Sequence, residues 1–146
     1  MSVRLTSNNH GAHRSRHQLP AHGHIGTNRY IRIWESFLAG DFVLCVSTEI
    51  LEEYEEVLAR NISPRVAQYV MMILMERSNV CKVNLYYRFR LIAADPDDNK
   101  FVDCAITSNA RYIVAEDRHF DALRQIDFPK VDVIGIDDFL EEMEKR

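Results

Sequence analysis

The residues best suited to chemistry are the acidic ones in the run DPDDNKFVDCAITSNARYIVAEDRHF, from Asp95 to Phe120. Asp95, Asp97 and Asp98 precede an apolar pattern of helical spacing, and Asp117 follows an apolar pattern typical of a strand. Carboxylate oxygens are the ligands that Mg²⁺ and Mn²⁺ prefer. If the fold brings these groups together, they predict a site for a divalent metal ion.

The helix that follows the acidic run determines which carboxylates face inward. Asp95 is a suitable N-cap, and Pro96 fits the first helical position, where no backbone N–H is needed. At about 100° per residue, Asp98 shares the apolar face, whereas Asp103 falls on the opposite side, which we expect to face solvent. The alternative for Asp98 is a half-exposed place in the first turn, where it only stabilises the positive end of the helix dipole. The apolar positions are Phe101, Val102, Ala105 and Ile106.

Two further elements are expected to bring carboxylates to the same place. Asp117 lies just beyond the carboxyl end of a predicted strand over residues 111–115, and ligands bind at that edge in open α/β sheets. Glu53 borders the apolar stripe of a helix that follows the apolar strand 42–46, with Ser47 or Thr48 as its cap. Among the acids of that helix, Glu53 is therefore the one expected to reach a shared site.

Charge divides the chain near residue 30. The net charge is −4, yet no Asp or Glu precedes Glu35, a stretch with five Arg and five of the six His. Residues 1–29 show no sustained periodicity, so we expect an atypical, disordered His/Arg-rich segment before a domain over residues 30–146. No apolar run could span a membrane, and the three cysteines form no C-x-x-C pair, so a reducing cytoplasm is expected.

Apolar strands alternate with amphipathic helices from Tyr30 onward, which predicts an α/β domain with a mainly parallel sheet. One loop, residues 86–90 with the sequence YYRFR, combines aromatic and basic side chains. Such a loop can stack bases and hold phosphates. Half-buried loop packing is the explanation that the sequence favours, so the RNA-binding residues stay unknown.

From Tyr30 to its end, the chain resembles the PIN domain family, in particular the branch classified as toxins of toxin–antitoxin systems. The resemblance covers about 115 residues. It rests on IWESFLAGDFVLCVSTEILEEYEEVL, DPDDNKFVDCAI, RYIVAEDRHF and VDVIGIDDFL. It implies a three-layer α/β/α domain and a metal-dependent endoribonuclease. By the family's motifs, Glu53, Asp98 and Asp117 would be the catalytic and metal-binding residues, with Asp95 and Asp97 as additional candidates. The implied cofactor is Mg²⁺ or Mn²⁺, and the implied partners are RNA, a cognate antitoxin and a second copy of the chain.

Two departures from the family pattern bear on activity. Ala115 stands where the family usually has Ser, Thr or Asn. The family also begins with an apolar strand that leads into Asp-Thr-Asn, whose aspartate is a principal metal ligand. Residues 1–29 offer no such Asp, so we expect the central strand to be absent or replaced and the chain to be a poor nuclease. The alternatives are a catalytically inactive binding module that pairs with an antitoxin, and another phosphotransfer fold with an aspartate nucleophile.

Overall fold

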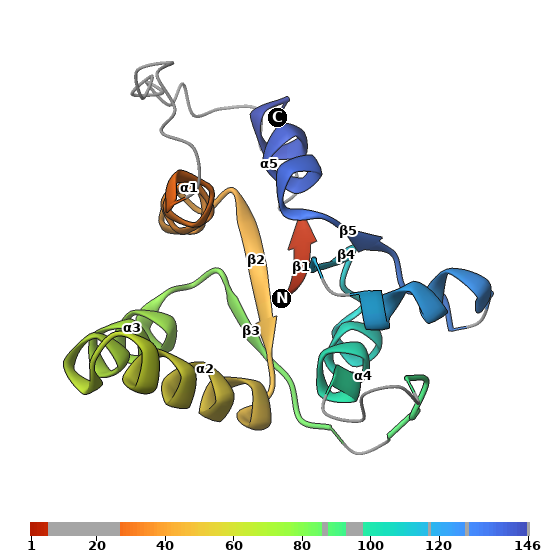
Figure 1. Ribbon diagram of the computed structural model, residues 1–146, viewed down its shortest axis with the longest axis horizontal. Coiled ribbons are helices and arrows are strands. Elements are labelled where there is room, and N and C mark those ends of the chain that lie inside the picture. Colours follow the sequence, from red (N-terminus) through yellow and green to blue (C-terminus); the bar gives the residue numbers. More distant parts are fainter. Residues whose placement is uncertain (6–26, 86–87, 93–97, 117, 128, 146) are drawn as a thin grey trace.

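The computed structural model describes residues 1–5, 27–85, 88–92, 98–116, 118–127 and 129–145. This part of the chain forms five strands, five α-helices and a 3₁₀ helix, η2 (Figure 1). In chain order the elements are β1 Ser2–Leu5, α1 Thr27–Leu38, β2 Phe42–Val46, α2 Thr48–Asn61, α3 Pro64–Glu76, β3 Val80–Lys82, α4 Asn99–Ser108, β4 Tyr112–Val114, η2 Arg118–Gln125, β5 Val133–Ile134 and α5 Ile136–Glu144.

The strands form one sheet in the order β3-β2-β1-β4-β5. β2 and β3 are parallel to each other, as are β4 and β5, and β1 is antiparallel to both β2 and β4. Four strands therefore run in one direction, and the central strand runs against them. The α/β class with a mainly parallel sheet and a replaced central strand is confirmed.

The replaced central strand comes from the N-terminal segment itself. Residues 1–29 were expected to be disordered and to contain no apolar strand that leads into an Asp; Ser2–Leu5 nevertheless pairs with β2 over four residues and with β4 over two. A gap between β2 and β4 would leave backbone N–H and C=O groups on both sides unpaired, and a short segment of any composition can satisfy them. α1 begins at Thr27, three residues before the expected boundary, and the division of the chain near residue 30 remains a prediction.

Local signals account for the helices next to the sheet. The Ser47 hydroxyl accepts a hydrogen bond from the backbone N–H of Ile50, and Ser63 does the same for Val66. These two N-caps start α2 and α3, and Ser47 is one of the two caps expected for α2. Gly40 has a φ of 78°, in the left-handed region that favours glycine, and it lies just after the end of α1.

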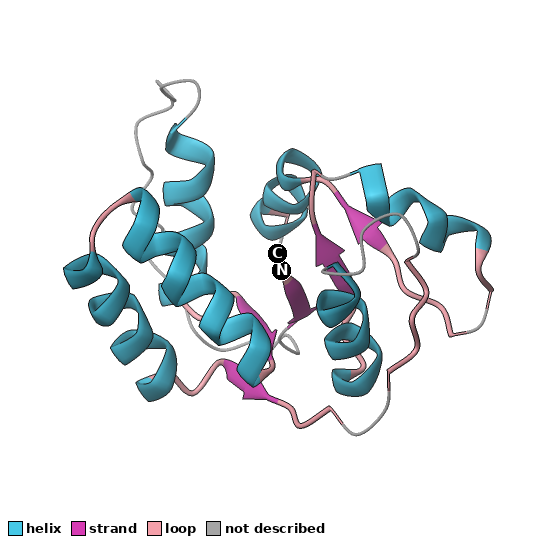
Figure 2. Cartoon of the chain, turned by 60° about the horizontal axis from the view of Figure 1, so that its bottom comes forward, coloured by secondary structure: helices cyan, strands magenta, loops and turns pink. Residues whose placement is uncertain are grey.

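Helices lie on both sides of the strands, which gives the three layers expected for the fold (Figure 2). The main core joins the strands to α1, α2, α3, α4 and α5, and Phe42 packs edge-on against Phe139 of α5. A second core lies between α4, β4 and η2 and includes Val102, Ile113 and Leu123. No helix in the described part of the chain is long and apolar enough to cross a membrane.

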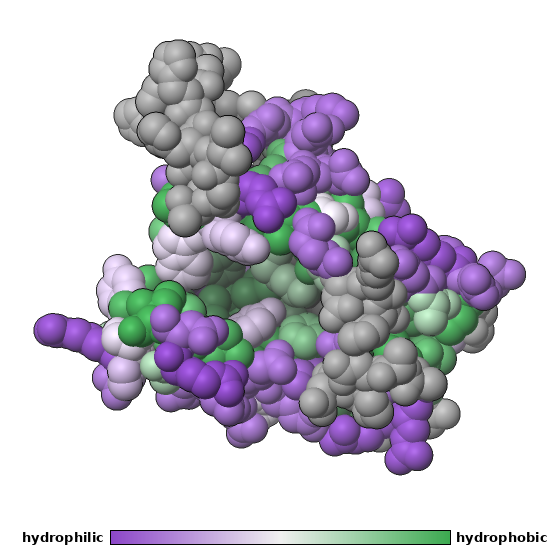
Figure 3. Space-filling view, in the orientation of Figure 1, coloured by the Kyte–Doolittle hydropathy of each residue, from purple (hydrophilic) through white to green (hydrophobic). Residues whose placement is uncertain are grey.

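Hydrophobic side chains are exposed over the α2–α3 pair, among them two of the three methionines of α3. The side chains of Met72 and Met75 are 60% and 67% exposed, and only Met71 packs against the core. Figure 3 shows hydrophobic side chains at the surface in this region. We call this surface the α2–α3 patch; it consists of Val57, Ile62, Tyr69, Met72 and Met75.

Candidate functional site

One ion pair joins two of the predicted site elements at the carboxyl edge of the sheet. Glu53 lies on α2, which starts directly after β2. Its Oε1 lies 2.8 Å from Nζ of Lys100, in the first turn of α4. The Glu53 side chain is 35% exposed and the Lys100 side chain 16%. Glu53 thus borders the buried stripe as predicted, and it contacts the DPDDNKF motif through a residue that the sequence analysis did not single out.

The start of α4 differs from the prediction. The helix begins at Asn99, and Asp98 is its N-cap residue, with helical backbone angles and no hydrogen bond from its side chain to the helix N-terminus. Asp98 is half-buried and directly precedes α4, whereas the sequence predicts it within the first turn of the helix. Asp95 and Asp97, the additional candidates, lie outside the described residues, as does Pro96.

The side chain of Asn99, which follows the acidic run, holds the backbone of Ile92, which precedes it. Its side-chain Oδ1 accepts a hydrogen bond of 2.8 Å from the backbone N–H of Ile92, and its Nδ2 donates one of 2.9 Å to the carbonyl of the same residue. Ile92 is only 2% exposed. The side-chain amide therefore pairs with Ile92 as a strand neighbour would, and it holds Ile92 beside the first residue of α4.

Asp103 was predicted to face solvent, and this is wrong. The residue is 2% exposed, and its Oδ1 accepts a hydrogen bond of 3.0 Å from the backbone N–H of Phe89. The segment that ends at Ile92 covers this side of α4, which a helical projection of α4 alone cannot reveal. Burial raises the pKa of Asp103, and the Phe89 N–H and the nearby Arg88 guanidinium partly offset that rise.

An open cleft of about 470 Å³ lies at the carboxyl ends of β2 and β3. Its lining combines the start of α2 with the chain that leaves β3. Arg88 reaches into this lining and forms an ion pair of 2.8 Å with Glu49. Tyr86 and Tyr87 of the YYRFR loop lie outside the described residues. The lining residues are Ser47, Thr48, Glu49, Val83, Asn84, Leu85 and Arg88.

The start of β1 lies at the same edge, because β1 runs against its neighbours. The α-amino group of Met1 donates a hydrogen bond of 3.1 Å to the carbonyl of Val114. Burial lowers the pKa of this amine to about 6, against the opposing effects of Cys104 and Glu53. The edge thus contains the beginning of β1 where the family pattern has the end of a strand.

Comparison with known proteins agrees with this architecture. A family model described as PIN domain matches residues 22–119. The chain belongs to the PIN domain family. The match spans α1 to the start of η2, so β1 lies outside it. No curated protein and no solved structure matches the chain significantly. Membership implies a nuclease-like fold and suggests RNA binding, and PIN domains are generally dependent on divalent metal ions.

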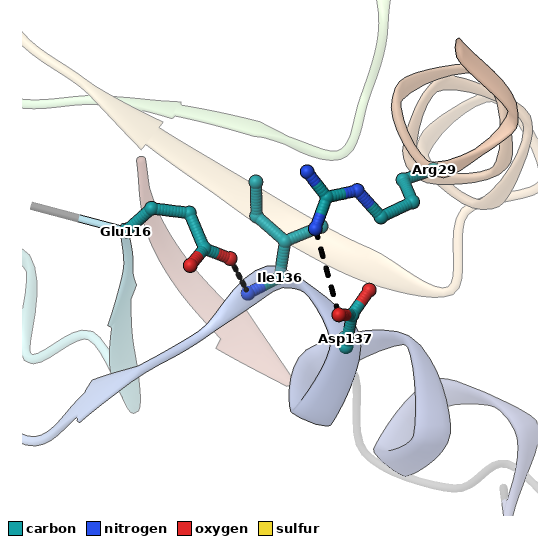
Figure 4. A network of polar contacts seen from close by, with 4 residues as sticks. All are labelled: Arg29, Glu116, Ile136 and Asp137. Atoms are coloured by element: carbon teal, nitrogen blue, oxygen red, sulfur yellow. Dashed lines mark hydrogen bonds and ion pairs between the residues drawn. The ribbon is translucent and has the colours of Figure 1, made fainter. Parts of the chain in front are cut away.

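The third predicted ligand of the PIN domain, Asp117, lies outside the described residues, but its neighbour Glu116 is fixed. Glu116 Oε1 accepts a hydrogen bond of 3.0 Å from the backbone N–H of Ile136, in the first turn of α5 (Figure 4). Gly135, the N-cap residue of α5, has no side chain, so Glu116 satisfies this N–H from another element. Asp137 lies in the first turn, and its Oδ2 is 3.5 Å from Nη1 of Arg29.

Two of the predicted ligands lie in the described part of the chain, and both have the donor chemistry that a divalent metal requires. Glu53 and Asp98 supply carboxylate oxygens, which suit Mg²⁺ and Mn²⁺. A cation already lies against Glu53, namely the ammonium of Lys100. Within the described ranges, no three His, Cys, Asp or Glu side chains are grouped closely enough to hold a metal ion. The expectation that Asp117 completes the set remains a prediction.

Three residues of the DPDDNKFVDCAI motif make contacts that were not predicted from the sequence, namely Asn99, Lys100 and Asp103. Lys100 lies in the first turn of the motif helix, close in sequence to the acidic run, and this is the signal that could have placed it near the site. The partners of Asn99 and Asp103 are backbone groups of residues 89–92, which carry no sequence signal.

Proposed function

We propose that this PIN domain is a metal-dependent endoribonuclease and the toxin component of a toxin–antitoxin pair. Glu53, Asp98 and Asp117 are the proposed catalytic and metal-binding residues, with Asp95 and Asp97 as additional ligands. The observation that carries the proposal is the Glu53–Lys100 contact of 2.8 Å, because it brings the glutamate of α2 to the first turn of the DPDDNKF helix. Two motifs more than 40 positions apart thereby meet at the edge where α/β proteins bind ligands.

Mg²⁺ or Mn²⁺ at this edge would lower the pKa of a water molecule and stabilise negative charge on the scissile phosphate. The chain's own contribution is to hold the carboxylates in place before RNA arrives. Lys100 orients Glu53, and Asn99 holds Ile92 beside the start of α4, the helix that Asp98 precedes. The open cleft beside Arg88 offers an adjoining surface for single-stranded RNA.

The α2–α3 patch supports the proposed protein partners. Tyr69, Met72 and Met75 expose hydrophobic surface on one helix, and clustered apolar surface of this kind marks contacts with other proteins. A cognate antitoxin or a second copy of the chain is the proposed occupant, and the proposed location is the cytoplasm.

The test measures RNA cleavage by the full chain with Mn²⁺, with Mg²⁺ and with a chelator. Cleavage should require the metal, and Asp98→Asn should lower kcat/KM on the order of 100-fold or more. The matched control is Asp132→Asn. Asp132 is exposed and directly precedes β5, at the opposite edge of the sheet, so its substitution should leave cleavage unchanged. Metal-independent cleavage, or equal effects of the two substitutions, would contradict the proposal.

A second candidate function is an inactive PIN-like module that still binds an antitoxin. The direction of β1 favours it, because this strand ends at Leu5, opposite Phe42 and thus at the edge remote from Glu53. Residues 1–29 also contain no acidic side chain that could replace the missing aspartate. If the chain binds the antitoxin stably but does not cleave RNA, the inactive binding module is the correct function and not the nuclease.

A further inference from the structure

Lys100 is the charged side chain that the proposed metal site does not use. Its ammonium contacts Glu53 at 2.8 Å, and the two residues come from different helices. The contact is largely shielded from water, since the Lys100 side chain is 16% exposed. An ordinary surface ion pair within α2 is longer and far more exposed. Arg60 and Glu56 are 4.0 Å apart, one turn from each other, and their side chains are 65% and 72% exposed.

The ammonium lies where a metal ion would have to approach. Mg²⁺ binds a carboxylate oxygen at about 2.0–2.1 Å, so an ion on Glu53 would be within a few ångströms of the Lys100 nitrogen. Two cations at that separation repel each other strongly when water is partly excluded. Lysine has a long flexible stem, so its head group can leave the carboxylate without any movement of α4.

We propose that Lys100 is a resident counter-cation of the acidic edge, which a divalent ion must displace from Glu53, and that its charge sets the metal affinity of the site. This inference rests on the proposed function, because it assumes that Glu53 is a metal ligand. Without metal, the lysine compensates the charge of Glu53 and keeps the carboxylate at the edge. With metal, the same carboxylate turns to the stronger cation.

The experiment titrates Mn²⁺ into the full chain without RNA, by calorimetry. Lys100→Gln should bind Mn²⁺ about tenfold more tightly than the unsubstituted chain, because the competing charge is removed. Lys100→Arg keeps the charge and grips a carboxylate with two donors, so it should bind Mn²⁺ more weakly. The matched control is Arg60→Gln, which removes a cation from a surface pair of α2 and should leave the dissociation constant unchanged.

The outcomes separate this inference from the proposed function. If the unsubstituted chain binds Mn²⁺ and Lys100→Gln binds it equally or less tightly, the counter-cation is wrong and the metal site stands. If neither protein binds Mn²⁺ at millimolar concentration, both proposals fail. If Lys100→Gln does not fold, Lys100→Arg decides, and equal or tighter binding of Mn²⁺ by that variant overturns the inference.

Discussion

Replacing Asn99 with alanine tests whether the motif helix is fastened through its side-chain amide. The substitution removes two hydrogen bonds, of 2.8 Å and 2.9 Å, that join Asn99 to the backbone of Ile92. Ile92 is 2% exposed, so its N–H and C=O groups cannot turn to water without local opening. Alanine therefore leaves one donor and one acceptor without a partner.

The expected loss of stability follows from these two bonds. A typical intramolecular hydrogen bond contributes about 1 kcal/mol net, and a buried group left unpaired costs somewhat more. We therefore expect Asn99→Ala to lower the free energy of unfolding by about 2–3 kcal/mol. For a chain of this length, that corresponds to a fall in Tm of roughly 4–10 °C. Asn99→Asp keeps the acceptor and loses the donor, so it should cost about half as much.

The assay is chemical denaturation of the full chain, followed by circular dichroism at constant pH. The matched control is Asn84→Ala, because Asn84 is exposed and has no side-chain contact that anchors a loop among the residues described. Its effect should stay within about 0.5 kcal/mol, as for most surface substitutions. If the two alanine variants unfold at the same denaturant concentration, the Asn99–Ile92 pairing contributes nothing and the reasoning is refuted.

Two further predictions concern Asp103 and the N-terminal segment. Burial raises the pKa of Asp103 above its ordinary value of 3.8 in the folded chain, so the folded state favours the protonated carboxyl. The contribution of this group to the free energy of unfolding is therefore fully present below pH 3.8, and it is lost as the pH rises through the folded pKa. Asp103→Asn keeps an oxygen that accepts from the Phe89 N–H but carries no charge at any pH. The stability of the variant relative to the original chain should therefore increase as the pH rises through that range, as measured by denaturation at several pH values. A difference in stability that stays constant with pH would contradict this. Replacement of residues 1–29 with an apolar strand that ends in Asp-Thr-Asn and a connecting loop should increase both stability and metal-dependent RNA cleavage. Equal cleavage by the original chain would refute the idea of a lost ligand.

The sequence predicts elements whose signals are local. Ser47 and Ser63 start their helices with side-chain hydrogen bonds to residues three positions on, and Gly40 follows the end of α1. Such contacts involve neighbours along the chain, so residue types alone reveal them. Glu53 was placed correctly for a related reason. Its position on α2 is a matter of helical phase, and the strand before α2 sets which edge the helix starts from.

Predictions failed where distant segments decide the environment. Asp103 is buried because residues 89–92 lie over α4, and nothing within α4 indicates that cover. Ser2–Leu5 has only two apolar residues at alternate positions, too few to distinguish a strand from irregular chain. Its strand conformation comes from the backbone groups of β2 and β4, which accept almost any sequence as a partner.

The direction of β1 connects the missing ligand with the role of Lys100. A central strand parallel to β2 and β4 would deliver its last residue to the edge that contains Glu53. β1 instead delivers Met1, whose backbone pairs with Val114, and it contributes no side-chain carboxylate there. An edge with one carboxylate fewer attracts a divalent ion less strongly. The positive charge of Lys100 then cancels a larger fraction of the negative charge that remains at the edge. Metal affinity in this chain should therefore respond more to removal of the lysine than it would in a PIN domain with its first aspartate in place. Lys100→Gln combined with the replaced N-terminal strand measures this dependence, because the gain in Mn²⁺ affinity from Lys100→Gln should be smaller in the chain that carries the added aspartate.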